Sequence, residues 1–122
     1  MLRKKVLVVD DEEQLRTMLG HELESMRCEV TRAGDGAEAI ELIRNTAFDL
    51  LILDIVMPGI DGFQVLKFAK ENHPHTKVIM LTGYSDLGHA IESKRLGADD
   101  FIGKPYNLTD LGTSIERLLG KW

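Results

Sequence analysis

The chain has 122 residues and a formal net charge of −5, with 43% hydrophobic and 29% charged residues. This size and balance are typical of one globular domain, and they exclude a disordered tail, a collagen-like repeat and a coiled-coil rod. The acidic balance argues against direct nucleic-acid binding, while the single cysteine and the short apolar runs predict a cytoplasmic protein without an internal disulfide or a membrane span.

Short apolar runs alternate with segments of helical periodicity along the chain. In chain order, the first half is predicted to contain a strand at 6–9, a helix at 15–26, a strand at 28–31, a helix capped by Asp35 and a strand at 48–53. The second half is predicted to contain a helix over 65–69, a strand at 77–81, a helix at 86–96, a strand at 100–103 and a helix from Asn107 to 118.

The alternation of five strands with five helices predicts the fold class. Strands that read as near-continuous apolar runs are buried on both faces, which is typical of a parallel sheet covered by helices. Crossovers between parallel strands are right-handed, so the sequence predicts a single doubly wound (βα)5 domain. We expect a five-stranded parallel sheet in the flavodoxin-like order 2-1-3-4-5.

Polar side chains follow the predicted strands where each strand ends. Asp10 and Asp11 follow the first strand, Asp54 ends the third, and Thr82 and Lys104 follow the fourth and fifth. In an open α/β sheet, ligands bind beyond the carboxyl ends of the strands at the point where the strand order reverses. In the order 2-1-3-4-5 this point lies between strands one and three. We therefore expect the three aspartates in one pocket, with the threonine and the lysine along its wall.

The residue types in this pocket indicate a particular chemistry. Three close carboxylates repel one another unless a cation or a proton neutralises them, and an all-oxygen cluster suits Mg2+. A lysine and a threonine hydroxyl can bind phosphoryl oxygens, and an aspartate can serve as a nucleophile that forms an acyl phosphate. The pattern predicts Mg2+-dependent phosphorylation of an aspartate.

Four segments carry a family resemblance: Val-Val-Asp-Asp-Glu at 8–12, Leu-Asp-Ile-Val-Met-Pro-Gly-Ile-Asp-Gly at 53–62, Leu-Thr-Gly-Tyr at 81–84, and Gly-Ala-Asp-Asp-Phe-Ile-Gly-Lys-Pro-Tyr at 97–106. In this order and spacing, the chain resembles a receiver domain of the response regulators of two-component signalling. The resemblance extends over residues 1–122. It implies a signalling phosphoacceptor, which catalyses its own phosphorylation and slow dephosphorylation but is not an enzyme acting on other substrates.

The resemblance implies a role for each acid. Asp54 would accept the phosphoryl group from a sensor histidine kinase or a phosphotransfer protein. Asp10, Asp11 and Asp54, with the backbone carbonyl of Val56, would hold Mg2+, for which Mn2+ can substitute.

The resemblance also implies roles for residues around the acids. Thr82 and Lys104 would bind the phosphoryl oxygens, and Thr82 with Phe101 would form the switch that responds to phosphorylation. Val56 and Tyr84 occupy positions that tune the lifetime of the acyl phosphate in this family. Because Val56 cannot position an attacking water and Tyr84 can shield the bond, we expect slow self-dephosphorylation.

The helix predicted at 86–96 is expected to be weakly anchored. Its apolar stripe is thin (Leu87, Ala90, Ile91 and Leu96), and Gly88 lies near its start, where glycine costs about 1 kcal/mol relative to alanine. Such an element suits a two-state switch. We expect this helix, with the last strand and helix, to bind an output protein or domain, or to form a homodimer on phosphorylation.

Two other functions compete with this interpretation, and each strand-end residue also has an ordinary explanation. Singly, Asp10–Asp11 could begin a helix, Asp54 could close a turn and Lys104 could lie in an exposed loop; their joint placement favours a site. A Mg2+-dependent hydrolase acting through an aspartyl phosphate would need a substrate cap, which the sequence lacks. A pure interaction module is expected to lack one of the acids, the threonine or the lysine, and all are present.

Overall fold

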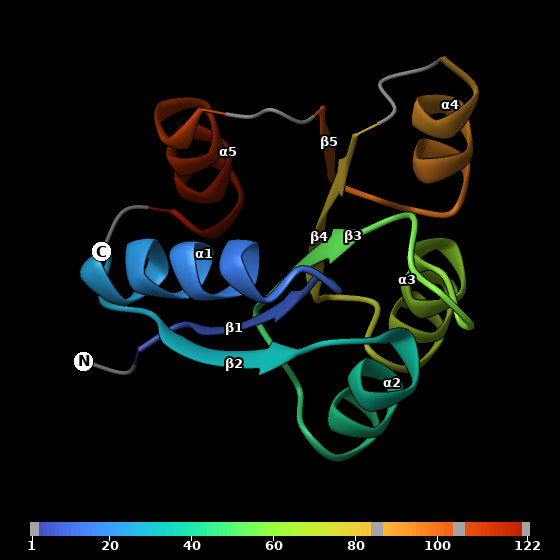
Figure 1. Cartoon of the computed structure of the whole chain (residues 1–122), viewed down its shortest axis with the longest axis horizontal. Helices are drawn as coiled ribbons and strands as arrows, with labels where there is room; N and C mark the ends of the chain where they lie inside the picture. The colour runs from blue at the N-terminus through green and yellow to red at the C-terminus, as the bar shows by residue number, and fades with distance from the viewer. Residues whose placement is uncertain (1–2, 84–86, 104–106, 121–122) are drawn as a thin grey trace.

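Strands and helices alternate along the residues that this computed structural model describes, which are 3–83, 87–103 and 107–120 (Figure 1). The strands are β1 (Lys5–Val9), β2 (Glu29–Ala33), β3 (Leu50–Asp54), β4 (Lys77–Thr82) and β5 (Asp100–Gly103). The helices are α1 (Glu13–Ser25), α2 (Gly36–Asn45), α3 (Gly62–Asn72), α4 (Leu87–Arg95) and α5 (Leu108–Leu119). All strand pairs are parallel and the order is β2-β1-β3-β4-β5, which confirms the predicted fold.

The sheet separates two apolar cores, because successive side chains along a strand point to opposite faces. One core lies between the sheet and helices α2 and α3, and its buried strand members are Leu7, Val9, Ala33, Leu51, Leu53, Val78 and Met80. Helices α1 and α5 cover the other face of the sheet (Figure 1). The core beneath them has the strand members Val6, Val8, Leu50, Ile52, Ile79 and Leu81. Burial on both faces explains why the central strands read as continuous apolar runs.

Side-chain caps start α2, α3 and α5. Oδ1 of Asp35 accepts a hydrogen bond from the Glu38 amide over 2.8 Å, and Oδ1 of Asn107 accepts one from the Asp110 amide over 2.6 Å, as the sequence predicts. Asp61 forms a capping box with Gln64 at the start of α3, a cap that was not predicted above. Within the described ranges, no helix is both long and apolar enough to span a membrane.

The boundaries of the second strand differ from the prediction of 28–31. The strand β2 covers Glu29–Ala33, because it pairs with β1 residue for residue up to Val9 and Ala33. Cys28 lies just before the strand and is buried. Burial, and then the negative charge of Asp49, raise the pKa of its thiol above the ordinary value.

The packing of α4 differs from the predicted apolar stripe. Leu87 is 75% exposed and Ile91 is 56% exposed, whereas the buried residue of the helix is Ser93. Of the predicted stripe, Leu96, just after the helix, does pack on the core beneath α2 and α3. The helix covers β5, an edge strand whose residues are only half-buried, so little apolar surface is available to hold it.

Candidate functional site

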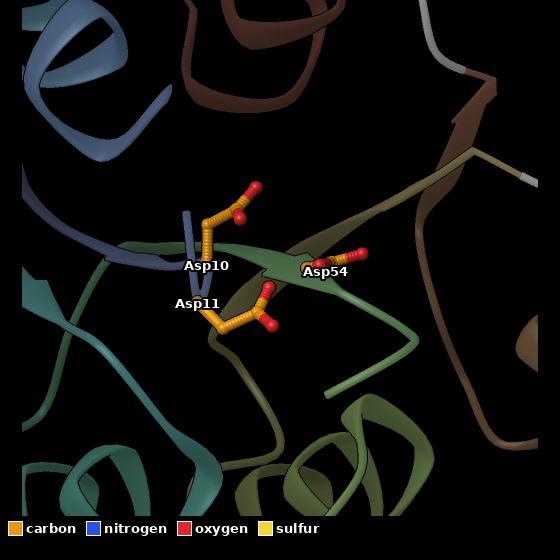
Figure 2. Close-up of side chains that lie close together, drawn as sticks. All are labelled: Asp10, Asp11 and Asp54. Atoms are coloured by element: carbon orange, nitrogen blue, oxygen red, sulfur yellow. The ribbon is translucent and has the colours of Figure 1, made fainter. Parts of the chain in front are cut away.

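Three carboxylates meet at the carboxyl ends of β1 and β3. The two strands are neighbours, and their register pairs Val9 with Leu53. Asp10, just after β1, and Asp54, the last residue of β3, therefore occupy neighbouring positions at this edge of the sheet. One carboxylate oxygen from each of Asp10, Asp11 and Asp54 lies within 4.8 Å of the others (Figure 2). Asp10 and Asp54 are only 1% and 5% exposed, whereas Asp11 faces solvent. The predicted convergence of the three acids is present.

Tight backbone packing holds Asp54 in place. The amide of Ile55 donates to the carbonyl of Leu81 over 3.0 Å, and the amide of Gly62 donates to the carbonyl of Ile55 over 2.9 Å. A Cβ at Gly62 would lie 2.3 Å from the carbonyl oxygen of Asp54, so glycine lets the first turn of α3 touch the end of β3. The phosphoacceptor candidate is therefore supported by its own strand, by β4 and by α3.

The other predicted residues around the acids lie on neighbouring strand ends. Thr82 ends β4 and is fully buried; it follows Leu81, which pairs with Asp54 in the sheet. Phe101, on β5, is half-buried and packs against the core beneath α2 and α3. Val56 follows β3 and is 49% exposed. Lys104 and Tyr84 lie outside the described residues, so their predicted roles remain predictions.

The acids differ from the other polar groupings in the described chain. Among His, Cys, Asp and Glu side chains there, only Asp10, Asp11 and Asp54 form a group of three close enough to hold one metal ion. His73 and His75 line a hollow of about 400 Å3 before β3 and β4, at the opposite end of the sheet. Their hollow is thus separate from the acidic site.

Asp100 ties the edge strand β5 to α5. Its Oδ2 accepts hydrogen bonds from the Ser114 hydroxyl and, over 3.0 Å, from the Arg117 guanidinium, and its Oδ1 accepts one from the Phe101 amide over 2.8 Å. Burial raises the pKa of Asp100, but these hydrogen bonds and the Arg117 charge outweigh burial and lower the pKa below its ordinary value.

Sequence comparison relates almost the whole chain to one family. The family model described as the response regulator receiver domain matches residues 6–116. Sporulation initiation phosphotransferase F of Bacillus subtilis is 30% identical over 98% of this chain and 96% of its own length. The DNA-binding transcriptional regulator NtrC of Escherichia coli K12 is 35% identical over the whole of this chain, which spans 26% of the length of NtrC.

Solved structures share the fold over nearly the full length. The chemotaxis protein CheY4 of Vibrio cholerae superposes with a TM-score of 0.90 at 33% identity, covering 96% of this chain and 99% of the other. A CheY-like receiver domain protein of Methanospirillum hungatei superposes with a TM-score of 0.92 at 34% identity, covering 95% of this chain and 93% of the other. The fold is therefore the CheY-like version of the flavodoxin-like sheet.

Proposed function

The chain belongs to the response regulator receiver family, and from this premise we propose that it accepts a phosphoryl group on Asp54 in a Mg2+-dependent reaction. A receiver domain implies a histidine kinase as partner, and the proposed donor is such a kinase or a phosphotransfer protein. The observation that carries the proposal is the convergence of a buried aspartate with two further carboxylates at one sheet edge. The proposed domain covers residues 1–122 and acts in the cytoplasm without binding DNA itself.

The acidic cluster has the donor set that a hard divalent cation requires. Asp10, Asp11 and Asp54 offer oxygens within 4.8 Å of one another, and the backbone carbonyl of Val56 follows Asp54 closely in the chain. These groups would hold Mg2+, or Mn2+ in its place. The bound ion would supply positive charge against the charge of the transferred phosphoryl oxygens.

Asp54, Thr82 and Lys104 would have different roles in the phosphoryl transfer. A carboxylate oxygen of Asp54 attacks phosphorus as the bond from phosphorus to the donor breaks, and the bonding electron pair leaves with the donor. The Thr82 hydroxyl and the Lys104 ammonium bind the phosphoryl oxygens. Because Asp54 is only 5% exposed, the surrounding strands limit the access of water to the acyl phosphate.

Intact-mass measurement after incubation with acetyl phosphate tests this function. With Mg2+ the protein is expected to gain one phosphoryl group. An excess of chelator is expected to prevent the gain, because without a cation the three negative carboxylates repel the anionic phosphoryl donor. No gain at any Mg2+ concentration would contradict the proposal and favour an interaction module. Continuous turnover of p-nitrophenyl phosphate would instead indicate a hydrolase.

The residues flanking the site are proposed to make the acyl phosphate long-lived. Val56 is 49% exposed beside Asp54 and has no polar group with which to orient water. The double variant Val56→Asn, Tyr84→Glu is therefore expected to lose its phosphoryl group faster than the wild type after the donor is removed. The rate is measured by the decay of the phosphorylated mass, and an unchanged decay would show that these positions do not set the lifetime.

The proposed output face consists of α4, β5 and α5. The weak anchoring of α4, with Leu87 and Ile91 exposed and Ser93 buried, supports a helix whose position can change. Phosphorylation adds up to about two negative charges at the site, to which Thr82 and Phe101 would respond. We propose that the shifted face binds an output protein or domain, or a second copy of the chain.

Amide hydrogen exchange tests the response of this face. Residues 87–103 are expected to exchange at a changed rate after treatment with acetyl phosphate and Mg2+, whereas the central strands β1 and β3 should stay protected. Exchange of 87–103 that is the same before and after phosphorylation would contradict the proposed output face.

A further inference from the structure

Arg16 extends from the start of α1 back to the end of β1. Its Nη1 donates a hydrogen bond to the main-chain carbonyl oxygen of Asp10 over 2.7 Å. The guanidinium lies beside Gly34, where a Cβ would stand 3.2 Å from Nη1. Glycine at this position, just after β2, therefore leaves the room that the arginine occupies. The half-buried side chain is held between the ends of β1 and β2.

The bond from Arg16 fixes one of the two peptide groups that flank Asp11. The carbonyl that it binds belongs to the peptide between Asp10 and Asp11. The following peptide is fixed as well, because the amide of Glu12 donates to Oδ1 of Asp10 over 2.9 Å. Within the described residues, no hydrogen bond or ion pair holds the exposed Asp11 carboxylate itself. Its direction therefore depends on the backbone on either side.

We propose that Arg16 is a positioning residue, which directs the Asp11 carboxylate onto a divalent cation shared with Asp10 and Asp54. The proposal deepens the function proposed above and rests on it, because it concerns the same acidic edge. A hydrogen bond from a charged donor is stronger than one between neutral groups, and a half-buried charge is less screened by salt. The guanidinium also offsets part of the repulsion among the three carboxylates.

Arg32 provides a matched control. Its guanidinium lies over Gly20 of α1, and its Nη2 is 3.3 Å from Oε1 of Glu24, near the far end of that helix. Removing Arg32 changes the net charge by the same amount as removing Arg16. It also removes the packing of a guanidinium on a glycine, but it leaves the bonds around Asp11 intact.

Calorimetric titration with MgCl2 tests the proposal on the wild type and on the variants Arg16→Met, Arg16→Lys and Arg32→Met. Removing a group that positions a metal ligand without itself binding the metal typically weakens metal affinity by about 10–100-fold. We expect Arg16→Met to weaken Mg2+ binding by a factor in this range. Arg16→Lys keeps the charge but not the planar guanidinium, so a smaller weakening is expected. Arg32→Met should bind Mg2+ as the wild type does.

The outcomes separate this inference from the proposed function. A wild type that does not bind Mg2+ would overturn the proposed function and, with it, the role of Arg16. If the wild type binds Mg2+ and Arg16→Met binds equally well, only the inference fails. Equal weakening in Arg16→Met and Arg32→Met would show a general effect of charge, which also overturns it. If Arg16→Met does not fold, the test rests on the Mg2+ affinity of Arg16→Lys. An affinity equal to that of the wild type would show that the planar guanidinium is not needed at this position and would overturn the inference.

Discussion

Replacing Asp54 by Asn is expected to abolish phosphorylation by acetyl phosphate, so that intact-mass measurement detects no modified protein. The amide is close to the carboxylate in size, and Asp54 is only 5% exposed, so the site should keep its shape. The amide oxygen is neutral and a weak nucleophile, and the variant also removes one of the three charges that hold the cation. Removing that charge relieves repulsion, so the free energy of unfolding is expected to rise.

Asp35→Asn is the matched control for this substitution. Asp35 is exposed and caps α2 through its Oδ1, and asparagine caps helices about as well as aspartate. The control should gain one phosphoryl group at the wild-type rate. A gain in Asp54→Asn that equals the gain in Asp35→Asn would mean that another residue accepts the phosphoryl group.

Replacing Gly62 by Ala is expected to lower the free energy of unfolding by about 1–3 kcal/mol, the usual penalty for overpacking a tight contact. The added Cβ would stand 2.3 Å from the carbonyl oxygen of Asp54 and 2.8 Å from Cα of Ile55. Both are backbone atoms, so neither can move aside as a flexible side chain does. The strain falls on the end of β3, and phosphorylation should slow as well. Denaturant unfolding measures the first effect, and the rate of mass gain measures the second.

Gly112→Ala separates this steric effect from the change of residue type. Gly112 lies inside α5, and a Cβ there would meet nothing within 4 Å. Alanine favours a helix interior by about 1 kcal/mol over glycine, so this variant should be more stable than the wild type. If Gly62→Ala were also as stable as the wild type, the close contact between α3 and β3 would not be a constraint.

The fold and the acidic cluster could be predicted from sequence because each depends on a general property of parallel sheets. Apolar runs buried on both faces indicate a parallel sheet, and the carboxyl ends of parallel strands meet at one edge. Asp10 and Asp54 therefore converge whatever the details of the loops between them. The caps at Asp35 and Asn107 were likewise predictable, since each is a contact between residues three apart.

The features that sequence reasoning missed depend on contacts between distant segments or on competing local signals. Nothing in the periodicity of α1 shows that Arg16 returns to the end of β1, or that Gly62 touches Asp54. The four apolar residues in and just after α4 were too few to determine which side of the helix faces an edge strand. At Asp61, the spacing to Gln64 is that of a capping box, but Pro58 and Gly59 just before it are residues typical of turns, so the local signals compete.

The hydrogen bonds of Asp100 make the attachment of α5 sensitive to acid. Because its pKa is lower in the folded chain than in the unfolded chain, the unfolded chain takes up a proton first as the pH falls. The ionised Asp100 stabilises the folded chain fully at pH values above the ordinary pKa range of aspartate. This stabilisation is lost as the pH falls through that range toward the pKa of Asp100 in the folded chain. Acidification thus weakens the bonds from Ser114 and Arg117, which makes β5 a point where the fold responds to proton concentration.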